Sequence, residues 1–392
     1  MSAHDVLITG IGLVSSLGQG IDAHWQALSA SAKPVLDAER FAPYTVHPLP
    51  EIDWNLQIAK RGDQRQMETW QRLGTYTAGM ALDDAGIKGD EALCASMDMI
   101  VAAGGGERDQ TVDEAILAAS EARNDHGILL NEKLTTELRP TLFLAQLSNL
   151  LAGNISIVHK VTGSSMTFMG EEGSGVAAVE TAAARIRVGQ STHALVGGAY
   201  NAEHPDMLLG YELGGYLHRG PWKPVWQRAG SEGGGVVTGS GAAFLVLESR
   251  EHAQRRGRKA YAELGPVRSG RASRSGEALA PALIDMFAGE AGPGAALVIS
   301  GASGAKLATA AEAAALAASG LAARRGIATT TGHLREAQFP FVVGIAAALV
   351  ARRSALPPLD PTEAAHAGPM DRVLATAVGF HRFEGAAMVS AA

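Results

Sequence analysis

The sequence lacks several features that would define its class at once. Its 392 residues include a single cysteine, Cys94, which excludes a disulfide framework and a cysteine-based zinc site. Lys and Arg number 33 against 40 Asp and Glu, and a formal charge of −7 argues against a nucleic-acid partner held by a basic face. The apolar run at residues 341–351 is too short to span a bilayer. Residues 1–10 do not resemble a signal peptide, so we expect a cytoplasmic protein.

Metal and cofactor motifs are also missing. The 12 histidines are scattered, without the paired spacing that metal sites need. Residues 10–15 (GIGLVS) follow an expected strand and resemble a dinucleotide fingerprint, but the third glycine is absent. Residues 301–306 (GASGAK) are too closely spaced for a P-loop, and the glycines at 233–235 are typical of a tight turn. We therefore expect no cofactor and no metal ion.

What the sequence does contain is an alternation of strands and helices. The expected helices, residues 66–86, 175–188 and 306–325, are rich in small side chains that let a helix approach a sheet closely. Near-continuous apolar strands that end in small residues are usually buried on both faces. This alternation predicts an α/β fold. Such strands are expected at residues 6–10, 99–104, 194–198, 296–301 and 373–379.

The order of these elements occurs twice. The first set closes with an expected strand at residues 241–248, and a basic stretch then leads into a second set. We predict two similar halves, residues 1–250 and 251–392, which form a duplicated fold and not a solenoid. Residues 106–140 are rich in charge and in helix-forming residues, so we interpret them as a long insertion in the first half.

Several motifs follow one another in a fixed order. Residues 6–18 read VLITGIGLVSSLG, residues 81–86 read ALDDAG, and residues 236–248 read VVTGSGAAFLVLE. Further on come TGH at residues 331–333 and VGF at residues 378–380. Together they resemble the β-ketoacyl-[acyl-carrier-protein] synthases of the condensing-enzyme, thiolase-like family, across essentially the whole chain. The resemblance implies a thiolase-like duplicated fold with five layers, αβαβα.

The family's catalytic residues can be carried over position by position. Its members hold the acyl chain on a cysteine thiolate at a helix N-terminus, and two histidines and a lysine assist decarboxylation and condensation. Counting back from residues 195–198, the nucleophile position falls on Glu172. The first histidine position matches Ala302, and the lysine position matches Ala328. Of the catalytic set only the second histidine, His333, is retained.

These substitutions change the expected chemistry. A Glu172 carboxylate would form a mixed anhydride from a thioester, so self-contained condensation is not expected. Cys94 lies far upstream and is best explained as a small buried residue. Glu172 is either a structural charge at a helix N-terminus or an acid–base group. His333 is either satisfied by local hydrogen bonds or a catalytic acid–base.

One subfamily shares this pattern. Chain-length factors lack the nucleophile, commonly carry Gln in its place, and pair with an active synthase. Residues 170–175 (GEEGSG) resemble their AEQAGG, with Glu172 at the Gln position. The resemblance implies a non-condensing partner of an active Cys-containing synthase, with an acyl carrier protein as a second partner. Residues 140–149 match the family's interface helix, so we expect the acyl pocket and interface to include Leu142, Phe143, Gln146 and Phe380.

Other interpretations stay open. The whole sequence resembles synthase-like proteins of very-long-chain fatty acid synthesis for lipid A, and aryl polyene or other type II polyketide pathways are the alternative. The chain could instead decarboxylate malonyl thioesters with Glu172 and His333. It could also be a genuine synthase whose catalytic residues are misaligned here. A homodimer is open as well.

Overall fold

The computed structural model describes residues 2–275, 277–288 and 296–392, except the side chains of residues 141 and 142. Two sets of five strands, one from each half of the chain, make up the main sheet. The two sets meet where residues 6–8 of β1 pair antiparallel with residues 262–264 of β9. The first set is, in spatial order, β4 (Ser165–Met169), β3 (Asp98–Ala103), β5 (His193–Tyr200), β8 (Gly241–Ser249) and β1 (Val6–Ser15). The second is β11 (Arg324–Gly326), β10 (Leu297–Ser300), β12 (Arg372–Val378), β13 (Glu384–Ser390) and β9 (Ala262–Gly270).

The two sets repeat one pairing pattern. β3 pairs in parallel with β4 and β5, and β8 pairs antiparallel with β5 and β1. In the second set β10 pairs in parallel with β11 and β12, and β13 pairs antiparallel with β12 and β9. A repeated topology of this kind supports the prediction of a duplicated fold. The boundary at residue 250 stays a prediction.

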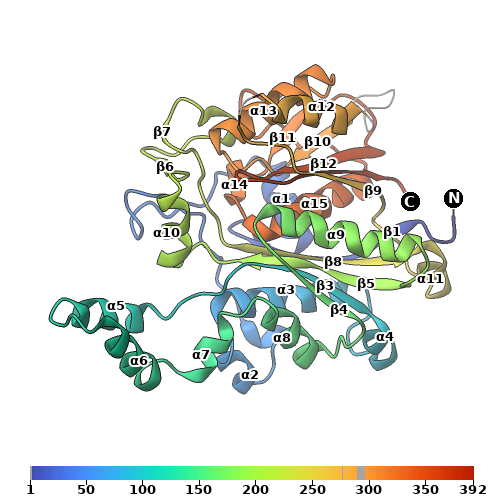
Figure 1. Cartoon of the computed structure of the whole chain (residues 1–392). Helices are drawn as coiled ribbons and strands as arrows, with labels where there is room; N and C mark the ends of the chain where they lie inside the picture. Colours follow the sequence, from blue (N-terminus) through green and yellow to red (C-terminus); the bar gives the residue numbers. More distant parts are fainter. Residues whose placement is uncertain (1, 276, 289–295) are drawn as a thin grey trace.

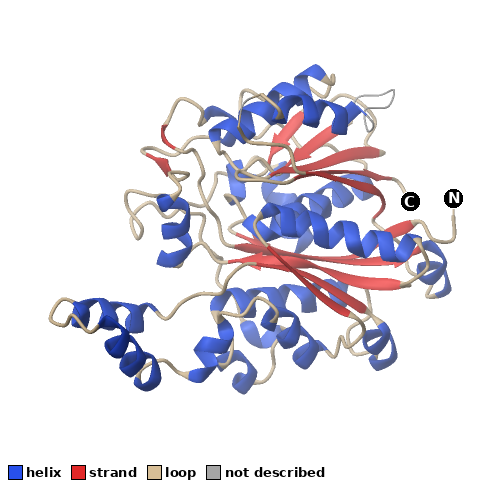
Figure 2. Cartoon of the chain, in the orientation of Figure 1, coloured by secondary structure: helices blue, strands red, loops and turns tan. Residues whose placement is uncertain are grey.

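Helices cover both faces of each set and give five layers (Figures 1 and 2). Between the sheets lie α9 (Glu172–Arg187) and α15 (Gln338–Arg352). The outer layers contain α3 (Thr69–Asp84) and α8 (Leu150–His159) on one side, and α12 (Leu279–Ala288) and α13 (Lys306–Ala318) on the other. The predicted αβαβα architecture is therefore confirmed.

Small residues explain the close layers. In α9 the alanines 178, 182 and 183 have no exposed surface, because the helix is enclosed by strands on both sides. A Cβ built at Gly12 would lie 2.2 Å from the Thr77 carbonyl of α3. The glycines of residues 10–15 therefore let α3 approach β1, which accounts for the motif without a nucleotide. The helix predicted at 306–325 is too long, since α13 ends at Ala318 and Gly320 takes a left-handed turn (φ +72°) before β11.

The remaining elements are short. Among the described residues no helix has the length and apolar character needed to cross a membrane. The helices are α1 (Gly20–Ser29), α2 (Arg61–Arg65), α4 (Glu91–Ser96), α5 (Gln110–Ser120), α6 (His126–Thr136), α7 (Pro140–Ala145), α10 (Pro205–Leu213), α11 (Arg250–Arg255), α14 (Ala328–Thr331), η1 (Trp54–Leu56), η2 (Val225–Gln227) and η3 (Arg335–Ala337). The strands are β2 (Gly18–Gln19), β6 (His218–Arg219) and β7 (Glu232–Gly233).

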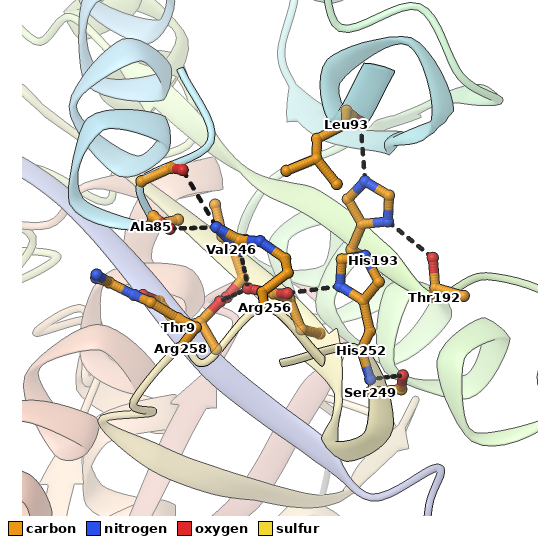
Figure 3. Close-up of polar contacts among 12 residues, drawn as sticks. Thr9, Ala85, Leu93, Thr192, His193, Val246, Ser249, His252, Arg256 and Arg258 are labelled. Carbon is orange, nitrogen blue, oxygen red and sulfur yellow. Dashed lines mark hydrogen bonds and ion pairs between the residues drawn. The ribbon is translucent and has the colours of Figure 1, made fainter. Parts of the chain in front are cut away.

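A buried polar cluster lies near the predicted join of the two halves (Figure 3). Glu248, with no exposed surface, accepts hydrogen bonds from Thr9 Oγ1 at 2.5 Å and Arg256 Nη1 at 2.8 Å. Its other oxygen lies 2.6 Å from His252 Nδ1, and the His252 ring stacks on His193 with centroids 4.5 Å apart. Burial alone would raise the pKa of Glu248, but these hydrogen bonds outweigh it and lower the pKa to about 2. The cluster ties β1, β5, β8 and the segment after β8 together.

Candidate functional site

Glu172 begins helix α9, as the sequence predicts. The chain reaches it from β4 through Gly170, whose φ of +147° favours glycine. The Glu172 side chain is only 1% exposed, and it stands in the first turn, where the helix dipole favours a negative charge. The position that motif spacing matches to the family's nucleophile thus holds a buried carboxyl group that solvent does not reach.

His333 faces this carboxylate. Its Nε2 lies 2.9 Å from Glu172 Oε1, and the backbone N–H of Phe380 donates to the same oxygen at 3.4 Å. Neither imidazole nitrogen makes a hydrogen bond of good geometry, and Glu172 Oε2 has no partner among the described residues. The pair is therefore close but incompletely hydrogen-bonded, which is costly for two fully buried polar groups.

Backbone contacts fix the position of His333. Its N–H donates to the Val237 carbonyl at 2.8 Å, and the Gly239 N–H donates to its carbonyl at 3.0 Å. Gly332 has φ +69°, and a Cβ at Gly239 would lie 1.9 Å from the Thr331 carbonyl. Residues 331–333 and 237–239 therefore cross closely, and this crossing needs glycine on both segments.

Ala302 and Ala328, which motif spacing matches to the family's first histidine and its lysine, come together. Both are buried in a small apolar cluster with Val225 and the partly buried Trp226. Beside them Arg228 is fully buried, and burial lowers its pKa to about 9. Its guanidinium donates to the carbonyls of residues 223, 235 and 328 at 2.8, 3.5 and 3.5 Å. Apolar contacts and the backbone hydrogen bonds of Arg228 thus hold this place together, and its match to the family's histidine and lysine positions stays a prediction.

An aromatic group covers the site. The Tyr211 ring of α10 meets the His333 ring edge-on at 6.3 Å, and it lies 5.1 Å from the Phe380 ring. Phe380 also contacts Tyr216 at 4.5 Å. The structure therefore places Phe380 directly beside Glu172 and His333. Its role in lining an acyl pocket stays a prediction.

A second buried ion pair lies next to the first. Arg335 Nε lies 3.2 Å from Glu336 Oε1, and the Arg335 guanidinium is 5.7 and 5.8 Å from the ring centroids of Tyr200 and Tyr211. Burial raises the pKa of Glu336 to about 7, although Arg335 opposes the shift. A Cβ at Gly104 would lie 2.6 Å from Glu336 Oε1. Space beside the site is thus filled by charged side chains.

The space that remains there is small. A cavity lined by Gly104, Tyr200, Arg335 and Glu336, among others, has a volume of about 10 Å³. That is room for about one water molecule. The sequence shows that residues 335 and 336 are charged, but it does not show the contacts that Arg335 and Glu336 make.

The other expected site residues lie elsewhere. Phe143 on α7 is 56% exposed, and the Gln146 carbonyl accepts from the Gly106 N–H at 3.0 Å. The side chain of Leu142 lies outside the described part of the chain. Their roles in the pocket and interface stay predictions. Cys94 is buried in α4 with its sulfur 3.6 Å from the Ile87 carbonyl, and burial raises its pKa, so this thiol is not activated.

A five-layered αβαβα fold built from two sets of strands with the same pairing pattern defines a thiolase-like protein. A family model described as "Beta-ketoacyl synthase, N-terminal domain" matches residues 3–253. The chain belongs to the β-ketoacyl synthase family.

Curated relatives support this assignment. The 3-oxoacyl-[acyl-carrier-protein] synthase 2 of Vibrio harveyi is 27% identical over 274 residues, which cover 67% of this chain and 62% of that protein. The tetracenomycin polyketide synthase ketoacyl synthase beta subunit of Streptomyces glaucescens is 27% identical over 263 residues, 64% of this chain and 60% of that protein. The chain thus spans about three fifths of the length of these relatives (62% and 60%).

Solved structures show the same fold. A β-ketoacyl synthase from Burkholderia phymatum STM815 has a TM-score of 0.79 and 20% identity, over 99% of both chains. The ishigamide ketosynthase/chain length factor has a TM-score of 0.77 and 18% identity, also over 99% of both chains.

Proposed function

We propose that this chain is a non-condensing, chain-length-factor-like subunit that works with an active Cys-containing β-ketoacyl synthase and an acyl carrier protein. The observation that carries the proposal is Glu172, a buried carboxylate at the nucleophile position, held against His333 at 2.9 Å. A carboxylate cannot accept an acyl group from a thioester productively, because the mixed anhydride that would form is higher in free energy than the thioester.

Two further observations support this role. Ala302 and Ala328 are packed with Val225 and Trp226, so the missing histidine and lysine have no polar substitute that reaches Glu172 among the described contacts. Curated relatives include a protein named as a ketoacyl synthase beta subunit, and the similar structures include one titled as a ketosynthase/chain length factor. For the pathway, we propose very-long-chain fatty acid synthesis for lipid A, on overall sequence resemblance, with aryl polyene or other type II polyketide synthesis as the alternative.

The contact between Glu172 and His333 favours one second function, decarboxylation of a malonyl thioester. In that reaction the carbon–carbon bond to the carboxylate breaks, CO₂ leaves, and a proton is delivered to the resulting enolate carbon. His333 is the proton donor that the geometry offers. Release of CO₂ from malonyl-carrier protein by the isolated chain, abolished in Glu172→Gln, would favour this function over the non-catalytic role.

Co-expression tests the proposed role. Co-purification of the chain with a Cys-containing synthase expressed together with it, and elongation only by the pair, is the expected result. The variant Glu172→Cys of the isolated chain should not elongate, because positions 302 and 328 still lack the histidine and lysine. Elongation by that variant without a partner would overturn the proposal.

A further inference from the structure

The helices α5 and α6 form an arm that stands away from the layered body (Figure 1). We define the arm as residues 109–137, from the N-cap of α5 to the C-cap of α6. Its two helices pack on each other through few buried side chains, Val112 and Leu129 among them. The arm also exposes Leu117, Ile128, Leu130 and Leu134, at 67, 59, 45 and 39%.

The arm carries most of the net charge of the chain. It has seven Asp and Glu against two Lys and Arg, a net charge of 2 − 7 = −5. The whole chain has 33 − 40 = −7, so the rest of it, at −7 + 5 = −2, is nearly neutral. A single acidic element on a nearly neutral body creates a directional electrostatic field.

Both cations of the arm form ion pairs with acidic residues of the arm. Arg123 binds Asp125 at 2.6 Å and Glu132 at 2.7 Å, and Lys133 binds Glu137 at 3.3 Å. Glu114 and Glu121 are exposed, and no cation contacts them among the described residues. Asp113 pairs with Arg108, which precedes the arm, at 2.6 Å. The arm therefore presents Glu114 and Glu121 as carboxylates without a cation partner among the described residues, beside exposed leucines and isoleucine.

The face next to the arm continues the apolar surface without adding charge. Residues 140–169 include one Lys or Arg, Lys160, and no Asp or Glu. This stretch includes β4, which ends the sheet in the described chain. It exposes Phe143, Leu144, Leu147, Ile157, Met166 and Met169.

We propose that the arm is the recognition element for the partner subunit, and that its docking surface on that partner is apolar and rich in Lys and Arg. The inference rests on the proposed function, since it names the chemistry of the partner. In a two-fold homodimer the same surface patch occurs on both subunits. If the homodimer interface were made of the arm and residues 140–169, a second copy would offer the arm either another arm of charge −5 or a face with one lysine. The charge of the arm thus opposes self-pairing and favours a different, basic chain.

Salt dependence tests this inference on the full-length chain alone. Sedimentation at 50 and 500 mM NaCl should show a monomer at low salt, with any self-association strengthened by salt as the repulsion is screened. The double variant Glu114→Lys and Glu121→Lys should self-associate at least ~10-fold more tightly at low salt. The matched control, Glu39→Lys and Glu277→Lys, makes the same charge change at two exposed acids outside the arm and should behave as wild type. Self-association of equal strength at both salt concentrations and in all three proteins would overturn the inference.

For the complex with the Cys-containing synthase, salt should have the opposite effect on affinity. Affinity for the Cys-containing synthase should fall with salt, and the Glu114→Lys, Glu121→Lys variant should bind at least ~10-fold more weakly than the control variant at 50 mM NaCl. A complex whose affinity depends neither on salt nor on the arm charges would refute the inference and leave the proposed function intact. The absence of any complex, together with elongation by the chain alone, would refute the proposed function itself.

Discussion

Two buried glutamates in this chain have opposite surroundings. Glu248 has both oxygens occupied by Thr9, Arg256 and His252, and these contacts tie several elements together (Figure 3). Glu172 has one oxygen near His333 and the Phe380 N–H, and the other without a partner among the described residues. The first arrangement is that of a structural ion cluster. The second is an incomplete polar network, at the position that motif spacing matches to the family's nucleophile.

The difference shows what the proposed loss of the condensing reaction would leave of the site. The surroundings of residue 172 still include a helix N-terminus, a histidine and a backbone N–H, all of which would suit a thiolate and its oxyanion. Ala302 and Ala328, the proposed histidine and lysine positions, lie in an apolar cluster. Under the proposed function, the scaffold of the site is retained while the groups that would move protons are largely gone.

The largest expected effect is at Glu248. The substitution Glu248→Gln leaves Arg256 and His252 without their anion in a buried place, so unfolding should become easier by ~3–5 kcal/mol. Urea denaturation followed by circular dichroism measures this change. The control Glu251→Gln, at an exposed residue of the same helix region that pairs with Arg255, should leave the midpoint almost unchanged. A loss for Glu248→Gln as small as that of the control would contradict a structural role.

The second effect is the acid dependence of the same cluster. The pKa of Glu248 falls from its ordinary value of 4.5 to about 2 in the folded chain. Its contribution to stability is therefore fully present above about pH 4.5 and is lost as the pH falls toward 2, an effect of roughly 3 kcal/mol. Comparing wild type with Glu248→Gln between pH 6 and 2.5 should show the gap between them closing. A gap that stays constant over this range would contradict the ion cluster.

The contribution of Glu336 to stability should depend on pH in the opposite direction to that of Glu248. The pKa of Glu336 is raised from 4.5 to about 7 by burial, so the protonated form suits the folded chain and stability falls as the pH rises from about 4.5 through 7. The variant Glu336→Gln should lose this dependence and be relatively more stable at pH 8 than at pH 5, compared with wild type. Melting temperatures across pH 5 to 8 test this, with the exposed Glu277→Gln as control. A constant difference across the range would show that Glu336 is ionised throughout.

The smallest expected effect is at Glu172. Because one carboxylate oxygen already lacks a partner, Glu172→Gln should change the free energy of unfolding by less than about 1 kcal/mol. The same denaturation experiment measures it beside Glu248→Gln. A loss as large as that at Glu248 would abolish the contrast between the two glutamates and would show that Glu172 is itself a structural anchor.

Much of the fold follows from the sequence because its signals are local. Apolar runs such as residues 194–198 and the alanine- and glycine-rich helices mark layers that must lie close together, and motif order identifies the family. The end of α13 was misjudged because alanines continue the helical composition up to the left-handed Gly320. Composition does not show where a single glycine reverses the chain.

The candidate site is predictable only in part. Glu172, His333, Ala302 and Ala328 follow from motif spacing, and the structure places Glu172 against His333 and the two alanines in one cluster. Arg228 and Tyr211 come from segments without a recognised motif. Their roles depend on contacts between residues far apart in the chain. Local sequence patterns do not predict such contacts.

The central claim is that this chain does not condense acyl groups by itself. The most direct test is an elongation assay in which the purified full-length chain receives an acyl-carrier protein and malonyl-carrier protein, with Cys94→Ala as the matched variant. The account predicts no 3-oxoacyl product from either protein alone, and product only when a Cys-containing synthase is added. Product from the wild-type chain alone, lost in Cys94→Ala, would contradict it.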